Sequence, residues 1–283
     1  MSEIGTTSGT IQVETCGAIV TIRLNRPEVN NAINSEMENE ILRVLELCQA
    51  DPEVKCVLLA ANGTNFSAGH DIAQVARERV TGEAPATLEG HYWARTGEML
   101  PTWRFSKALV VAAKGFVGPH AIAWLLTADV LIAAENTRFS FEETRIGIGA
   151  PYGPYALLAY HFPIRVVKQL WIAGGWMDAA TALRLDFVNR VVPLGEEEEE
   201  ARRYCRSFEA MDVANIVANK QGIHQLYEAA GLEKMIDAGR EPYQPSGAAA
   251  AEQAEHFAII HERGVAAAIR NRDSAVDRAV LKV

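Results

Sequence analysis

The sequence predicts an α/β fold with a helical C-terminal region, on three observations. Over the front two-thirds of the 283 residues, short apolar runs typical of buried strands alternate with helical patterns. The last third shows helical patterns only. Apolar residues make up 49% of the chain, which suffices for a large core and is too many for a disordered protein. We therefore expect a mixed core over residues 1–200 and a helical region over residues 201–283.

Composition narrows the partners and the compartment. The net charge of −9 argues against nucleic acid as the main partner, because phosphate binding needs a basic face. Cys16, Cys48, Cys56 and Cys205 show no metal-type spacing, so we expect reduced, buried thiols and no metal site. The N-terminus holds neither a basic segment nor an apolar run, and no apolar stretch reaches membrane-spanning length. These features predict a cytoplasmic protein without a signal peptide or membrane contact.

The chain begins with a predicted strand, helix and strand. Residues 18–24 alternate apolar and polar side chains, as a half-buried strand does. Asn34 or Ser35 can cap the helix that follows. Residues 54–61 are apolar apart from one lysine, which is typical of a strand covered on both faces. The helical spacing between these strands is carried by Met37, Ile41, Val44, Leu45 and Cys48.

Residues 62–72 (NGTNFSAGHDI) contain a run of small residues. Residues 67–69 let the backbone bend sharply and let a ligand approach it, and Asp71 can cap the next helix. The alternative is an ordinary turn after a strand. The charged and irregular residues 73–101 predict a lid or specificity loop, or else a surface excursion whose aromatic side chains pack on the body.

The stretch 115–149 gives the strongest indication of chemistry. A buried strand at residues 108–114 runs into a glycine-containing turn, a short apolar helix at residues 122–128 and a second strand at residues 130–134. A helix start has unpaired N–H groups and the positive end of the helix dipole, which suit an anionic oxygen. Two acids follow at residues 142–143. This combination predicts chemistry on a carbonyl compound.

The remaining patterns complete the interleaved core. Helices are predicted at residues 155–161, 164–173 and 179–185. Asp178 can cap the last of these, and a short strand follows at residues 187–193. The acidic run 196–200 predicts a solvated helix start, where negative charge complements the helix dipole.

Six stretches resemble the crotonase, or enoyl-CoA hydratase/isomerase, superfamily. The most specific is residues 66–72 (FSAGHDI), which resembles the first oxyanion-hole motif of that family. Residues 113–129 occupy the place of its second, usually glycine-rich motif, and residues 139–147 resemble the acid-bearing segment after it. The other three stretches are residues 24–34, 174–193 and 262–272.

The resemblance implies a crotonase-like spiral of ββα units with two roughly perpendicular sheets and a helical C-terminal trimerisation region. It implies a homotrimer or a hexamer, which the alanine-rich C-terminal helices also favour. It further implies an acyl-CoA substrate, so that coenzyme A is part of the substrate and no separate cofactor is needed. Two backbone N–H groups would bind the thioester oxygen and stabilise an enolate, and here these are the amides of His70 and His120.

The chain departs from the family pattern at the second motif. His120 and its neighbours replace the usual consecutive glycines, and Ala123 replaces the first catalytic glutamate of the hydratases, whereas Glu143 keeps the second. One carboxylate can still move a proton between carbons, as an isomerase does, and His120 could supply the missing group because imidazole titrates near neutral pH. The residues expected to contact substrate are Ala68, Gly69, Asp71, Tyr152 and Arg26.

Two other functions stay open at this point. Family members that hydrolyse carbon–carbon bonds of cyclic 1,3-diketones carry a histidine at the place of His120, together with a second histidine and an aspartate. Tyr152 and Glu143 hold those two places here, so the match to that set is incomplete. The third reading is a non-catalytic protein with the crotonase fold, against which the complete FSAGHDI stretch and Glu143 both argue.

Overall fold

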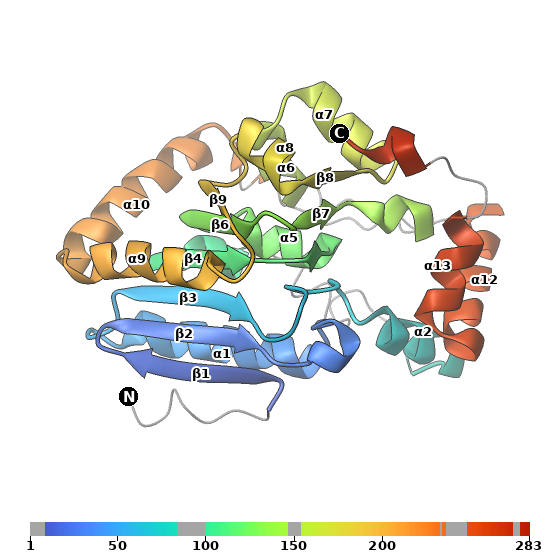
Figure 1. Cartoon of the computed structure of the whole chain (residues 1–283), viewed down its shortest axis with the longest axis horizontal. Coiled ribbons are helices and arrows are strands. Elements are labelled where there is room, and N and C mark those ends of the chain that lie inside the picture. The colour runs from blue at the N-terminus through green and yellow to red at the C-terminus, as the bar shows by residue number, and fades with distance from the viewer. Residues whose placement is uncertain (1–8, 84–99, 147–153, 233, 236–247, 274–277) are drawn as a thin grey trace.

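The strands form two sheets, which confirms the predicted α/β class (Figure 1). The computed structural model describes residues 9–83, 100–146, 154–232, 234–235, 248–273 and 278–283. In this part of the chain the larger sheet has six strands and the smaller sheet has three. The residues after 200 that the structure describes are helical apart from turns and the chain end, as expected.

The larger sheet is parallel except at one edge. Its order is β1 (Ile11–Cys16), β2 (Ile19–Leu24), β3 (Cys56–Ala61), β4 (Ala108–Ala113), β6 (Val130–Ala134) and β9 (Arg190–Val192). The pair β1–β2 is antiparallel and the other pairs are parallel. Every residue of β3, β4 and β6 is buried, because both faces of the sheet are covered there. The predicted strands 18–24, 54–61, 108–114 and 130–134 are confirmed within two residues at each end. The expectation that residues 18–24 are half-buried was wrong, because β2 lies inside the sheet and five of its six residues are buried.

The smaller sheet lies close to the predicted site. It contains β5 (Phe116–Val117), β7 (Arg138–Ser140) and β8 (Trp176–Asp178), with β5 and β7 parallel and β7 and β8 antiparallel. β5 comes directly before the turn that carries Pro119 and His120. An isolated bridge between Ser67 and Val117 joins the FSAGHDI loop to this sheet.

Two helix predictions were wrong in their boundaries. The apolar helix expected at residues 122–128 is α5 (Pro119–Leu125), because a proline at the first helical position starts a helix instead of breaking it. Residues 73–101 were expected to be irregular, yet α2 (Ile72–Thr81) and α4 (Leu100–Arg104) occupy the two ends of that stretch. The rest of the predicted lid, residues 84–99, lies outside the described residues.

The other helices follow the predicted order. They are α1 (Ser35–Ala50), α6 (Pro154–His161), α7 (Ile164–Ile172), α8 (Ala179–Arg184), α9 (Glu197–Glu209), α10 (Val213–Ala229), α12 (Ala248–Arg263) and α13 (Val265–Asp273), with single 3₁₀ turns η1 (Pro27–Val29), η3 (Glu142–Ile146) and η4 (Arg278–Leu281). Asn34, Asp71 and Asp178 are confirmed as caps, each accepting a backbone N–H of the first turn. The expected solvated start of α9 was wrong at Glu197, which is buried and accepts the Gly195 amide.

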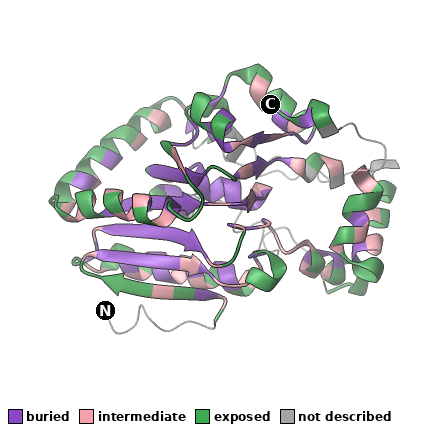
Figure 2. Ribbon diagram, viewed as in Figure 1, coloured by how far each residue is buried: buried purple, intermediate pink, exposed green. Residues whose placement is uncertain are grey.

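Burial is concentrated in the strands and in α5, whereas the outer faces of the surrounding helices are exposed (Figure 2). α12 and α13 lie beside α2, away from α9 and α10 (Figure 1). α10 exposes large apolar side chains to solvent, among them Leu226, which is 72% exposed. The trimer or hexamer stays a prediction. Three cysteines are buried as expected, but Cys16 is exposed. No helix in the described ranges is long and apolar enough to cross a membrane.

Candidate active site

The FSAGHDI loop is held by backbone hydrogen bonds to the segment before α1. Ser67 Oγ donates to the Asn31 carbonyl at 2.8 Å and accepts the Gly69 amide at 3.0 Å. The Ile33 amide donates to the Gly69 carbonyl at 2.8 Å. Gly69 has φ of +85°, a conformation that favours glycine. The small residues singled out in the sequence therefore form a tight turn that hydrogen bonds hold in place.

The turn before α5 packs directly against this loop. The Gly118 amide donates to the Ser67 carbonyl at 2.8 Å. A Cβ atom on Gly118 would lie 2.1 Å from the Ala68 carbonyl oxygen, so only glycine fits there. A Cβ on Gly69 would lie 3.3 Å from the His120 amide nitrogen, so that amide also borders the loop. The structure thus brings together the loop of Ala68, Gly69 and His70 and the start of α5 with His120.

The side chains of the two histidines form a buried stack. Their ring centroids are 3.8 Å apart with an interplanar angle of 19°. Burial lowers the pKa of His120 to about 3. Burial, and then the charge that His120 would carry, keep the pKa of His70 well below its ordinary value. Both rings are therefore neutral at neutral pH.

A carboxylate from α1 completes this cluster. His120 Nε2 lies 3.1 Å from Glu38 Oε1, and the two side chains are 2% and 1% exposed. Glu38 was not predicted as a site residue, because it lies in the acidic first turn of α1 and is 82 residues away from His120 in the sequence. A signal was available: Glu38 falls on the same helical stripe as Ile41 and Leu45, which are buried.

Arg26 and Asp71, both expected to contact substrate, contact each other. Arg26 Nη1 lies 2.9 Å from Asp71 Oδ2 and also donates to the Ala32 carbonyl. Asp71 in turn caps α2 by accepting the Gln74 amide at 3.1 Å. This pair ties the FSAGHDI loop to the segment before α1. A direct role of either side chain in substrate binding stays a prediction.

Glu143 lies in η3, on a segment held by an ion network. Glu142 accepts hydrogen bonds from two arginines: Arg138 Nη2 donates to Oε1 at 2.7 Å, and Arg272 Nη2 of α13 donates to Oε2 at 3.1 Å. Asp273, the last residue of α13, binds Arg145 of η3 and Arg272. These five residues, Arg138, Glu142, Arg145, Arg272 and Asp273, are called the η3 ion network below. Glu142 is thus structural, and Tyr152 lies outside the described residues.

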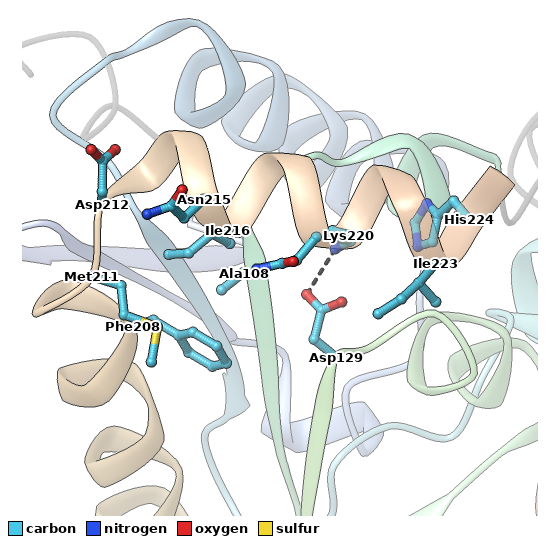
Figure 3. A pocket seen from close by; sticks show the side chains of 11 residues that line it. Ala108, Asp129, Phe208, Met211, Asp212, Asn215, Ile216, Lys220, Ile223 and His224 are labelled. Atoms are coloured by element: carbon cyan, nitrogen blue, oxygen red, sulfur yellow. Dashed lines mark hydrogen bonds and ion pairs between the residues drawn. The ribbon is translucent and has the colours of Figure 1, made fainter. Parts of the chain in front are cut away.

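A separate cavity of about 410 Å³ lies at the other end of the strands of the larger sheet, away from His120 (Figure 3). Ala108 begins β4 and Asp129 precedes β6, so the cavity is at the amino ends of these strands, whereas His120 follows the carboxyl end of β4. Lys220 of α10 binds Asp129 at 2.7 Å on its wall. Burial, and then Lys220, lower the pKa of His224 to about 4. The sequence analysis did not predict this cavity.

The sheets, the ββα units and the two packed turns define a protein of the crotonase class. The model of the enoyl-CoA hydratase/isomerase family matches residues 14–253, and the chain belongs to this family. The resemblance in the sequence is thereby confirmed.

Relatives with different names share this family. Carnitinyl-CoA dehydratase of Citrobacter koseri is 30% identical over 193 residues, covering 68% of this chain and 71% of that protein. Trans-2-decenoyl-[acyl-carrier-protein] isomerase of Streptococcus mutans is 27% identical over 212 residues, covering 73% of this chain and 78% of that protein. The crystal structure of an enoyl-CoA hydratase/isomerase from Xanthobacter autotrophicus has a TM-score of 0.85 at 27% identity, over 96% of this chain and 100% of that one.

Proposed function

We propose that this protein is a hydratase or isomerase that acts on an acyl-CoA thioester through an enolate. The amides of His70 and His120 bind the thioester oxygen, and Glu143 transfers protons at the carbon skeleton. No metal or separate cofactor takes part in this chemistry. The related carnitinyl-CoA dehydratase and trans-2-decenoyl-[acyl-carrier-protein] isomerase are named for acyl groups carried on CoA and on acyl-carrier protein, which supports a thioester substrate.

The observation that carries the proposal is the backbone contact between the two turns. The Gly118 amide bonds the Ser67 carbonyl, and the amide of His120 lies in the first turn of α5, where N–H groups have no carbonyl within the helix to bond. Backbone donors of this kind are fixed before substrate arrives, so they stabilise a developing negative charge without reorganising. The side chains at positions 70 and 120 can therefore vary while the donors remain.

Glu143 is the residue whose removal tests the chemistry. Glu143→Gln keeps the size of the side chain and removes the titrating group, so turnover should fall by about 10²- to 10⁴-fold. The assay uses 2-enoyl-CoA and 3-enoyl-CoA thioesters of several chain lengths, and it measures hydration and double-bond migration separately. Glu135→Gln, which changes an exposed glutamate after β6, is the matched control and should leave turnover unchanged. Near-normal turnover of Glu143→Gln would reject the acid/base assignment.

A second candidate function is hydrolysis of a carbon–carbon bond in a cyclic 1,3-diketone. The contact of the His120 imidazole with the Glu38 carboxylate favours it, because this imidazole is partnered as a proton-transfer group would be. Calorimetry with acetyl-CoA separates the two candidates. Binding of acetyl-CoA supports the thioester enzyme, whereas diketone hydrolysis by a protein that does not bind acetyl-CoA supports the hydrolase.

A further inference from the structure

We propose that Glu38 is a positioning residue that makes His120 the second proton-transfer group of the site. The pair then does the work of the carboxylate that is absent at Ala123, and the reaction it serves is the addition of water to the double bond. This inference rests on the proposed function, since it concerns the same thioester site.

Glu38 and His120 are in direct contact. Glu38 Oε1 lies 3.1 Å from His120 Nε2, and α1 and α5 are joined there by side chains that are almost completely buried. The His70 ring covers one face of the His120 ring at 3.8 Å, and the Trp124 ring meets it at an interplanar angle of 64°. The imidazole is therefore held in one orientation by contacts on its edge and its face.

The contact also bears on the tautomer of His120. A neutral imidazole has one N–H, and a carboxylate beside Nε2 favours the hydrogen at that nitrogen. The lone pair is then on Nδ1. Glu38 thus leaves Nδ1 of His120 as the basic nitrogen, and we assign that nitrogen to the attacking water.

The buried position of the Glu38 carboxylate costs free energy of folding. Burying a carboxylate destabilises a protein unless hydrogen bonds compensate it, and an apolar residue on the stripe of Ile41 and Leu45 would pack there without that cost. A carboxylate becomes useful when the imidazole takes a proton, because it offsets the new positive charge in a site of low polarity. The arrangement is therefore suited to proton transfer more than to packing.

The proton and electron movements balance in the hydration direction. Nδ1 of His120 takes a proton from water as the water oxygen bonds to the β-carbon. The electron pair of the double bond moves to give the enolate, which the two amides stabilise. Protonated Glu143 then gives its proton to the α-carbon. The proton on His120 returns to Glu143 through solvent, so both groups are restored.

The test combines a spectroscopic and a kinetic measurement. Nitrogen-15 NMR of the histidine side chains, with His120 assigned by comparison with His120→Gln, should show protonated Nε2 and unprotonated Nδ1 in the wild-type protein. Glu38→Gln keeps an acceptor oxygen but removes the charge, and should lower kcat for hydration by about 10- to 100-fold with little change in KM. Double-bond migration, which Glu143 performs alone, should change less than about threefold.

Matched variants separate positioning from folding. Glu36→Gln changes an exposed glutamate in the same turn of α1 and should alter neither reaction. Glu38→Asp keeps the charge and should recover part of the hydration rate. A wild-type spectrum with the proton on Nδ1, equal loss of both reactions in Glu38→Gln, or a wild-type enzyme that isomerises without hydrating would each overturn the inference. The expected tautomer in a protein that turns over no thioester would reject the proposed function instead.

Discussion

The two parts of the site are built in opposite ways. The turns at His70 and His120 are joined by backbone hydrogen bonds and by the close approach of Gly118 to Ala68, and the side chain of His120 is buried. The segment that carries Glu143 is held by the η3 ion network, whose long charged side chains join positions up to 130 residues apart. The first part permits almost no substitution at Gly69 and Gly118, whereas the second has several overlapping contacts.

This difference suggests a division of tasks. The proposed oxyanion donors need fixed geometry, and backbone contacts supply it because they do not depend on side-chain rotamers. The η3 ion network instead links the turn that carries Glu143 to α13, and we expect the docking of α13 to affect the position of that turn. Loss of geometry in the first part should remove activity from a folded protein. Loss of a contact in the second should affect stability and activity together.

The largest effect is expected from Gly118→Ala. The added Cβ would lie 2.1 Å from the Ala68 carbonyl oxygen, so one of the two turns must move. Loss of one oxyanion donor typically lowers the rate by about 10²-fold or more. Gly222→Ala in α10 is the matched control, because its Cβ meets nothing outside its own helix within 4 Å and alanine favours a helix. Full activity of a folded Gly118→Ala protein would refute the assignment of the two donors.

The central strands β2, β3, β4 and β6 could be predicted from the sequence because apolar runs of strand length report burial directly. β1 was not predicted, since Ile11–Cys16 is an edge strand with mostly exposed side chains, and β5, β7 and β8 were not predicted because they are only two or three residues long. The start of α5 was misplaced because Pro119 was assigned to the glycine-containing turn instead of the first position of the helix. These errors occur where the local sequence pattern does not report the position of the segment in the folded protein.

The site could be predicted only where it is local in sequence. The FSAGHDI loop and Glu143 are each marked by their own stretch of chain. The pairing of Glu38 with His120 depends on how α1 lies against α5, and no pattern within either helix reports that packing. The same holds for the η3 ion network, because Glu142 alone does not indicate its contact with Arg272.

The second prediction addresses the η3 ion network. Arg272→Met keeps the length of the side chain and removes its contacts with Glu142 and Asp273. Since these groups are mostly buried, stability should fall by roughly 1–3 kcal/mol. Turnover should fall about tenfold, because a small displacement of a catalytic group is costly.

The control for this variant is Arg203→Met. Arg203 binds Glu200 with a side chain that is 64% exposed, so the loss of its ion pair should change stability by less than about 1 kcal/mol and leave turnover unchanged. Arg272→Met that loses stability but keeps full turnover would show that η3 positions Glu143 without help from α13.

The smallest effect is expected from acidification, which should lower the free energy of unfolding through the two histidines of the first part of the site. The pKa values of His70 and His120 are lowered by burial in the folded protein, so the unfolded chain binds more protons below its ordinary pKa of about 6.5. Their contribution to stability is therefore present above that pH and is lost as the pH falls toward the folded values.

Urea unfolding at pH 7.5 and 5.5, at one protein concentration, measures the difference. Each buried histidine should account for about 1 kcal/mol of the stability lost between these pH values. Glu38 faces His120 and opposes this loss, because its carboxylate stabilises the imidazolium. His120→Gln should therefore lose less stability on acidification than the wild-type protein, although it begins less stable. His261→Gln, which changes an exposed histidine of α12, should behave as the wild type does. Equal pH sensitivity of His120→Gln and the wild type would contradict the lowered pKa of His120.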